Sequence, residues 1–280
     1  MDVPPIVDAD WVLARTDAAD PSATTGVVLA DVRWYLDGRS GRDAYDGGHV
    51  PGAVFVDLDV VLAGPATPEG GRHPLPDPEA FARGMAGLGI GDGDTVVAYD
   101  DDGGVMAARL VWMLRATGHD AALLDGGIAA WDGPLEAATP PRPPAAFAPV
   151  PWPADRVATA DDAADRANVV IDARTRERYL GLDDPVDPRW GHVPGARSLP
   201  ARENLAPDGR FLAAGDLRAR FEALGVEPGT PVVSYCGSGV TACHNLLAME
   251  QAGVGEGRLF PGSWSQWSAD ERRPVATSDD

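Results

Sequence analysis

Two short segments of the first half recur in the second half of this chain, and this duplication constrains the fold more than any other feature. An apolar run that ends in Asp-x-Arg occupies residues 29–33 and again residues 170–174, and the hexapeptide Gly-His-Val-Pro-Gly-Ala begins at Gly48 and again at Gly191. A third pattern, Val-Val-x-Tyr, also occurs once in each half. Because the motifs keep the same order in both halves, we expect two copies of one structural unit.

A proline-rich stretch separates the two copies. The chain has 280 residues, which is enough for two domains of ordinary size. Residues 140–144 read Pro-Pro-Arg-Pro-Pro, and further prolines follow. This composition is typical of an extended, semi-rigid linker rather than a helix. We therefore predict a first domain at residues 1–138, a linker at 139–153 and a second domain at 154–280.

Each half alternates short apolar runs with longer amphipathic ones. In the second half, residues 169–171 and 232–235 are rich in Val and Ile and predict strands, whereas residues 216–224 and 241–251 predict helices. Strands that alternate with helices indicate a parallel sheet covered on both faces, the α/β class. In such sheets, ligands bind beyond the carboxyl ends of the strands.

A cysteine follows one of these predicted strands directly. Cys236 begins the run Cys-Gly-Ser-Gly-Val-Thr-Ala, residues 236–242, which we call the cysteine loop. Gly237 and Gly239 allow the backbone to curl so that N–H groups converge, and the following helix adds its positive dipole end. Both effects favour the thiolate over the thiol. The alternative is a buried cysteine in an ordinary strand–turn–helix.

Composition excludes several function classes. The formal charge is -20, which disfavours binding to nucleic acid or to an anionic membrane. The chain contains no lysine, so Schiff-base chemistry and lysine-dependent phosphate loops are excluded, and arginine, backbone or hydroxyl groups must hold any anion. The two cysteines form no zinc-type pattern, and we expect neither metal nor cofactor. The N-terminal residues lack a signal-peptide pattern, which favours the cytoplasm.

The duplicated motifs and the single cysteine loop resemble the two-domain sulfurtransferases of the rhodanese type. The resemblance implies two tandem rhodanese-like domains, each a mostly parallel sheet with helices on both faces. The loop is similar to that of the 3-mercaptopyruvate sulfurtransferases, whereas thiosulfate-specific relatives carry basic residues after the cysteine. It implies that Cys236 takes sulfur from a small anionic donor, 3-mercaptopyruvate, and forms a persulfide. Cyanide, a small thiol or a thioredoxin-like protein would then accept the sulfur.

The resemblance also implies roles for particular residues. Arg178 matches an arginine that grips the donor carboxylate, and Arg189 is a second counterpart with a departure in local spacing. A proposed Asp–His–Ser relay corresponds to three residues of this chain, and the loop supplies further substrate-binding positions. Surface salt bridging is the alternative for the two arginines, and loop capping is the alternative for the histidine. The relay residues are Asp59, His73 and Ser238, and the further loop positions are Gly237, Gly239, Val240 and Thr241.

The first half has Asp100 where the second has Cys236, so we expect it to be an inactive scaffold. His49 and His192 recur in both halves and are expected to be structural.

A thiosulfate:cyanide sulfurtransferase remains an alternative, as does a non-catalytic sulfur carrier or binding module. A cysteine phosphatase or arsenate reductase would need an arginine where this chain has Ala242.

Overall fold

The computed structural model describes residues 3–15, 26–138 and 141–278. Contacts between residues divide the chain into two compact units. The first unit comprises residues 1–63, 76–152 and 207–211, and the second comprises 64–75, 153–206 and 212–280. Residues 64–75 thus come from the first half of the sequence but pack in the second unit, and we call them the crossing segment. The predicted domain boundaries at 138 and 154 stay a prediction.

The first unit contains a five-stranded sheet in the order β1-β5-β4-β2-β3, and its strand pairs are parallel. Connections through helices separate neighbouring parallel strands, as expected for this class. The strands are β1 (Ile6–Val7), β2 (Val27–Asp31), β3 (Val54–Phe55), β4 (Thr95–Tyr99) and β5 (Ala121–Leu124). The helices are α1 (Ala9–Leu13), α2 (Gly41–Gly47), α3 (Leu58–Val61), α4 (Pro78–Gly87), α5 (Ala107–Ala116) and the 3₁₀ turn η1 (Gly127–Ala130).

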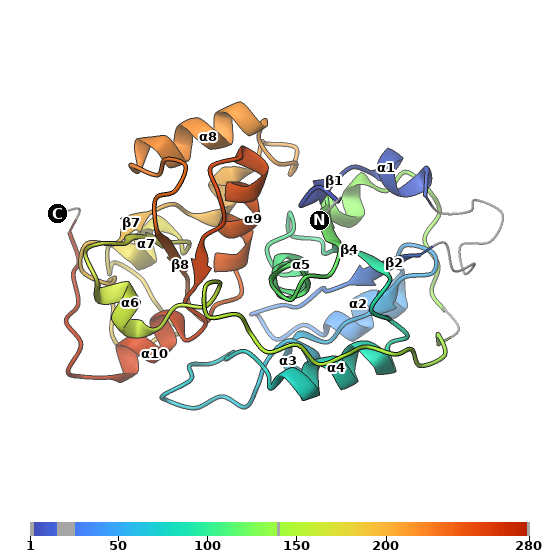
Figure 1. The fold of residues 1–280 in the computed structure, drawn as a ribbon, viewed down its shortest axis with the longest axis horizontal. Coiled ribbons are helices and arrows are strands. Elements are labelled where there is room, and N and C mark those ends of the chain that lie inside the picture. Colours follow the sequence, from blue (N-terminus) through green and yellow to red (C-terminus); the bar gives the residue numbers. More distant parts are fainter. Residues whose placement is uncertain (1–2, 16–25, 139–140, 279–280) are drawn as a thin grey trace. The chain divides into compact units, whose positions relative to one another are not determined.

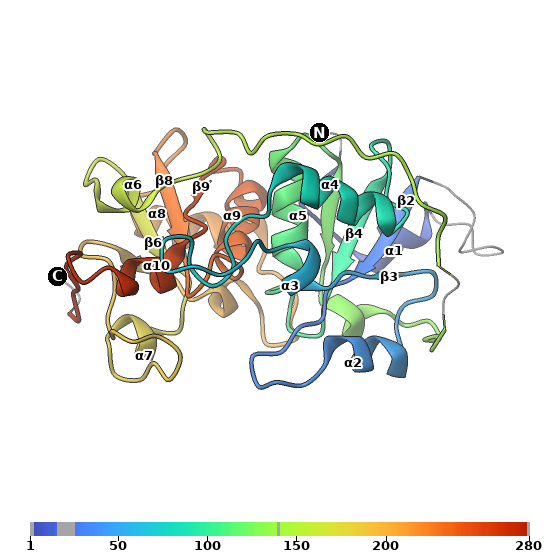
Figure 2. The same ribbon diagram turned by 90° about the horizontal axis from the view of Figure 1, so that it is seen from below.

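The second unit contains a four-stranded sheet in the order β7-β6-β8-β9, again with parallel pairs. Helices α8 and α9 contact each other, as do α6 and α10, and the two pairs lie on opposite sides of β8 (Figures 1 and 2). The strands are β6 (Val169–Asp172), β7 (Arg197–Ser198), β8 (Val232–Tyr235) and β9 (Arg258–Leu259). The helices are α6 (Ala160–Ala164), α7 (Arg176–Tyr179), η2 (Ala201–Asn204), α8 (Ala214–Ala223), α9 (Ala242–Ala252) and α10 (Ser263–Ala269).

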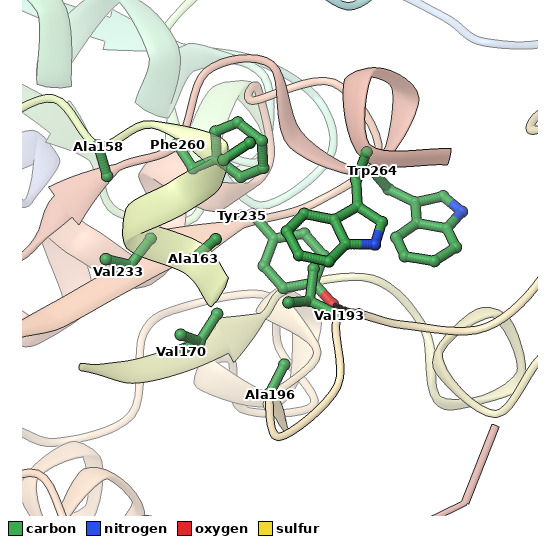
Figure 3. Close-up of a cluster of buried hydrophobic side chains, with 11 residues drawn as sticks. Ala158, Ala163, Val170, Val193, Ala196, Val233, Tyr235, Phe260 and Trp264 are labelled. Atoms are coloured by element: carbon green, nitrogen blue, oxygen red, sulfur yellow. Dashed lines mark hydrogen bonds between the residues drawn. The ribbon is translucent and has the colours of Figure 1, made fainter. Parts of the chain in front are cut away.

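Strand β8 is buried on both faces because its side chains alternate between two layers. Val233 and Tyr235 belong to a cluster that also contains Phe260 and the α10 tryptophan Trp264 (Figure 3). Ser234 faces the other layer, where its hydroxyl donates to the carbonyl of Ala242 at the start of α9. This period of two is what a central strand with helices on both faces requires.

The duplicated motifs build the same internal scaffold in each unit. The Arg174 side chain donates through Nε and Nη2 to the Asp172 carboxylate and through Nη2 to the carbonyl of Gly191, and Arg33 makes the equivalent bonds to Asp31 and Gly48 in the first half. The ring of His192 stacks on Tyr179 with centroids 3.7 Å apart, and its Nδ1 lies 2.7 Å from the Tyr179 carbonyl oxygen. The repeated histidines therefore have packing roles that explain their recurrence in both halves.

Across the described ranges, no helix has the length and apolar character needed to span a membrane.

Candidate functional site

Cys236 directly follows β8, at the carboxyl end of a central parallel strand. Its residue is 2% exposed, so the sulfur sits inside the second unit rather than on its surface. Helix α9 begins six residues later, and Thr241, at its N-cap position, makes no side-chain cap hydrogen bond. The loop between strand and helix thus surrounds the cysteine, as the sequence predicts.

The start of α10 holds the backbone of the cysteine loop in place. The Ser263 hydroxyl accepts a hydrogen bond from the Cys236 N–H at 3.1 Å and donates to the Phe260 carbonyl at 2.8 Å. The N–H groups of Trp264 and Ser265 donate to the carbonyls of Cys236 and Gly237. Ser263 has a φ of 52°, a left-handed conformation that is uncommon for a non-glycine residue. Such backbone strain is typical of positions that shape a functional loop.

The loop backbone also provides a polar partner for the sulfur. The Gly239 N–H donates to Cys236 Sγ at 3.2 Å, which is the direction that stabilises a thiolate. Gly239 has a φ of 78°, and a Cβ at this position would collide with the carbonyl oxygen of Pro261. Glycine is therefore required here for both conformation and space. The second cysteine, Cys243, is buried on α9 and its Sγ donates to the Gly239 carbonyl.

Two guanidinium groups lie beside the loop at Gly237. A Cβ built on Gly237 would be 3.0 Å from Arg72 Nη2 and 3.4 Å from both terminal nitrogens of Arg178. Arg178 is the arginine that the sequence points to, whereas Arg72 belongs to the crossing segment and was missed. Its position directly before His73, in a chain without lysine, is the signal that would have found it.

Buried carboxylates bind both arginines. Asp187, whose side chain is 1% exposed, bridges them: Arg72 Nη1 pairs with its Oδ1, and Arg178 Nη2 pairs with its Oδ2 at 2.8 Å. Asp184 lies 3.0 Å from Arg178 Nη2 and 3.3 Å from Arg174 Nη1. The hydrogen bonds and ion pairs among the described residues leave Arg72 Nη2 and Arg178 Nη1 without a protein acceptor.

The crossing segment also brings a histidine to the loop. His73 Nδ1 lies 2.7 Å from Ser238 Oγ, and this contact joins residues 165 positions apart in the sequence. The segment is fixed there because the Arg72 N–H donates to Ser265 Oγ at 3.0 Å. Asp59, the third member of the predicted relay, belongs to the first unit, where Trp34 Nε1 donates to its carboxylate. Its step in the relay stays a prediction.

The remaining predicted residues divide between the loop and the C-terminal segment. Val240 is buried within the loop. Arg189 instead donates to the main-chain carbonyls of Asp270 and Arg273, each at 2.9 Å. Its guanidinium thus stabilises the chain after α10, and the two free guanidinium edges at Gly237 belong to Arg178 and Arg72.

The corresponding loop of the first unit contains a carboxylate instead of a sulfur. Asp100 Oδ1 accepts from the N–H groups of Asp102 and Gly104, and Oδ2 accepts from those of Met106 and Ala107, all at 2.8–2.9 Å. Burial raises the pKa of Asp100, and these four bonds oppose the shift. The same turn in a duplicated fold therefore converges N–H groups on a negative centre, and in this half the chain's own side chain fills it.

Among the described residues, no group of three or more His, Cys, Asp or Glu side chains is arranged to hold a metal ion.

Comparison with known proteins identifies the fold family. The model of the rhodanese-like domain matches residues 8–133 and 156–270. A probable 3-mercaptopyruvate sulfurtransferase of Pseudomonas aeruginosa is 41% identical over 98% of both chains, and a putative thiosulfate sulfurtransferase of Mycobacterium tuberculosis is 38% identical over 96% of both. The solved 3-mercaptopyruvate sulfurtransferase of Leishmania major superposes with a TM-score of 0.84 at 29% identity, covering 98% of this chain and 77% of that one. The tandem α/β fold expected from the duplication is thereby confirmed, and the chain belongs to the rhodanese-like family of sulfurtransferases.

Proposed function

We propose that this enzyme takes the sulfur of 3-mercaptopyruvate onto Cys236 and passes it to a thiophilic acceptor. The observation that carries the proposal is the pair of free guanidinium edges at Gly237, next to the buried Cys236. Two planar cations with unsatisfied donors match one carboxylate, which mercaptopyruvate carries at the end opposite its thiol. Relatives named as 3-mercaptopyruvate sulfurtransferases support the same donor.

In the first half-reaction, Arg178 and Arg72 hold the donor carboxylate and direct its sulfur toward Cys236. The Cys236 thiolate attacks that sulfur, an S–S bond forms, and the carbon–sulfur bond breaks with its electron pair going to the carbon as the enolate of pyruvate. The donor's thiol proton passes through Ser238, supported by His73, to the enolate carbon. The products are pyruvate and a Cys236 persulfide, and no external oxidant is needed.

In the second half-reaction, a nucleophile attacks the outer sulfur and the Cys236 thiolate leaves. Cyanide becomes thiocyanate, and a small thiol or a thioredoxin-like thiol becomes a persulfide. The Gly239 N–H donates to Cys236 Sγ and therefore stabilises the thiolate both when it attacks the donor and when it leaves the persulfide. This N–H is already oriented, so neither step requires the loop to reorganise.

We also propose a reducing compartment such as the cytoplasm, since Cys236 must return to the thiolate after each turnover.

Mass spectrometry of the intermediate tests the assignment of the nucleophile. Treatment with donor and no acceptor should add one sulfur to Cys236 and none to Cys243, which is packed against the Gly239 carbonyl. Cys236→Ser should abolish turnover, whereas Cys243→Ser should retain it. Sulfur on Cys243, or an active Cys236→Ser variant, would contradict the proposal.

A thiosulfate sulfurtransferase is the second candidate, since a relative 38% identical carries that name. Thiosulfate has two negative charges and is best served by cations in the cysteine loop, but Gly237 and Ser238 occupy the positions after the cysteine. We expect 3-mercaptopyruvate to exceed thiosulfate in kcat/KM by at least about tenfold. A preference for thiosulfate would overturn the donor and leave Cys236 in place, and absence of turnover with either donor would indicate a sulfur carrier.

A further inference from the structure

The carboxylate of Asp187 is the feature of the site that the sulfur-transfer chemistry leaves unused. It is buried, and each of its two oxygens forms an ion pair with one of the two arginines beside the loop. We propose that Asp187 is a specificity-determining residue, which sets the charge of the donor pocket so that monoanionic donors are preferred over dianionic ones. This inference rests on the proposed function and deepens it.

The charges around the pocket cancel. We define the arginine–aspartate cluster as the six side chains joined by these ion pairs, which are Arg72, Arg174, Arg178, Asp172, Asp184 and Asp187. Three arginines face three aspartates, so the formal charge of the cluster is zero. A bound monoanion leaves the site with one excess negative charge, whereas a bound dianion leaves it with two, in surroundings that screen charge poorly.

The placement of Asp187 gives it this effect without blocking the donor. It contacts Arg72 through Nη1 and Arg178 through Nη2, which leaves Arg72 Nη2 and Arg178 Nη1 available beside Gly237, where a Cβ would lie 3.0 Å and 3.4 Å from them. A guanidinium has donors on more than one edge, so it can bind a fixed carboxylate and an incoming one together. Asp187 therefore orients both arginines and also removes half of their combined charge.

A neutral substitute separates the charge effect from the orientation effect. In Asp187→Asn, the cluster gains one net positive charge, and a dianion benefits from that charge more than a monoanion does. We expect the ratio of kcat/KM for 3-mercaptopyruvate to kcat/KM for thiosulfate to fall by at least about tenfold, mainly because thiosulfate improves. Asp183→Asn is the matched control: this exposed neighbour carries the same charge, and its variant should keep the ratio within about twofold. Equal losses with both donors, or an unchanged ratio, would show that Asp187 only positions the arginines.

Arg72→Gln provides a test with the opposite sign. Arg72 is on the crossing segment and its side chain is 32% exposed, so its loss should be tolerated by the fold better than the loss of a buried group. Removing this cation should weaken thiosulfate at least about tenfold more than 3-mercaptopyruvate. A greater loss for 3-mercaptopyruvate would overturn the proposal even if Asp187→Asn failed to fold.

A binding measurement keeps this test independent of the donor assignment. Pyruvate and sulfate, a monoanion and a dianion, should protect Cys236 against alkylation by neutral iodoacetamide. Asp187→Asn should lower the half-protecting concentration of sulfate relative to wild type, and this factor should be at least about ten times the corresponding factor for pyruvate. If the wild-type enzyme does not use 3-mercaptopyruvate, the proposed function fails while this protection ratio still decides the role of Asp187. If the ratio does not change, the role of Asp187 fails while the wild-type kinetics still decide the donor.

Discussion

The guanidinium of Arg178 contacts two buried carboxylates and also lies beside the cysteine loop, and single substitutions can test what these contacts contribute. Its Nη2 is shared by Asp184 and Asp187, and both terminal nitrogens lie 3.4 Å from a Cβ built on Gly237. The sequence resemblance pointed to this residue, and the proposed function explains why arginine suits the position: one planar group would bind fixed carboxylates and an incoming anion together. Lysine has no second edge and cannot reproduce this.

Arg178→Ala is expected to impair donor use much more than acceptor use. A charge-assisted hydrogen bond contributes about 1.5–3 kcal/mol, which corresponds to roughly 10–150-fold in kcat/KM for the donor. Arg178→Lys should restore part of this loss. Steady-state kinetics with donor and acceptor varied separately will measure both effects. Arg189→Ala is the control, because its guanidinium binds the Asp270 and Arg273 carbonyls, and a loss as large as that of Arg178→Ala would place it at the site instead.

At the scale of an element, the N-terminus of α6 shows how local sequence fixes a helix in the second unit. Thr159 and Asp162 form a reciprocal capping box, in which each side chain binds the other's backbone N–H. The Thr159 hydroxyl and N–H, with a smaller contribution from Arg258, lower the pKa of Asp162 to about 2. The pattern Thr-x-x-Asp is readable from the sequence, unlike the ion pair with Arg258 on β9.

The capping box predicts how stability depends on pH. A carboxyl whose pKa is lower in the folded state than in the unfolded state stabilises the folded state. For Asp162 this contribution is fully present when the pH is above the unfolded-state pKa of 3.8, and it is lost as the pH falls toward the folded-state pKa of about 2. Asp162→Asn should therefore lower Tm at pH 7, and the difference from wild type should shrink between pH 4 and pH 2. Thermal unfolding across this range will measure it. Asp155→Asn removes an exposed carboxylate of the same domain and should follow the wild-type curve, and equal behaviour of both variants would refute the capping argument.

At the scale of the whole molecule, the chain completes its candidate site with a segment from the other half of the sequence. The crossing segment packs in the second unit and carries both Arg72 and His73. Gly71, in the same segment, has a φ of 80°, and a Cβ there would lie 2.5 Å from the Gly262 carbonyl oxygen and 2.7 Å from Ser265 Oγ. Contact this close needs glycine, so Gly71 sets how near Arg72 and His73 come to the loop.

Gly71→Ala should displace the crossing segment and thereby reduce catalysis. A misplacement of about 1 Å can cost on the order of 100-fold in rate, and we expect kcat/KM for the donor to fall at least about tenfold. Gly209→Ala is the matched control, since Gly209 also has a positive φ of 81° but no atom within 4 Å of the added methyl. Both variants carry similar backbone strain, so similar activities in the two would show that the collision at Gly71 does not matter.

The sequence alone determined the duplication, the α/β class and the position of Cys236 directly after a strand, whereas Arg178 was named only from the resemblance to a known family. The first three features depend on local patterns, namely the period of two in strands, the glycines of a tight turn and repeated motifs, and each can be read within a few residues. The tertiary structure alone decided that Arg72 joins Arg178 at Gly237, that Asp187 bridges them, and that Arg189 binds the C-terminal segment instead. The contact of His73 with Ser238 spans 165 residues, and no local pattern encodes its distance. Such contacts arise from how the crossing segment packs on the start of α10, which depends on close backbone approach at Gly71 and on buried charge pairing.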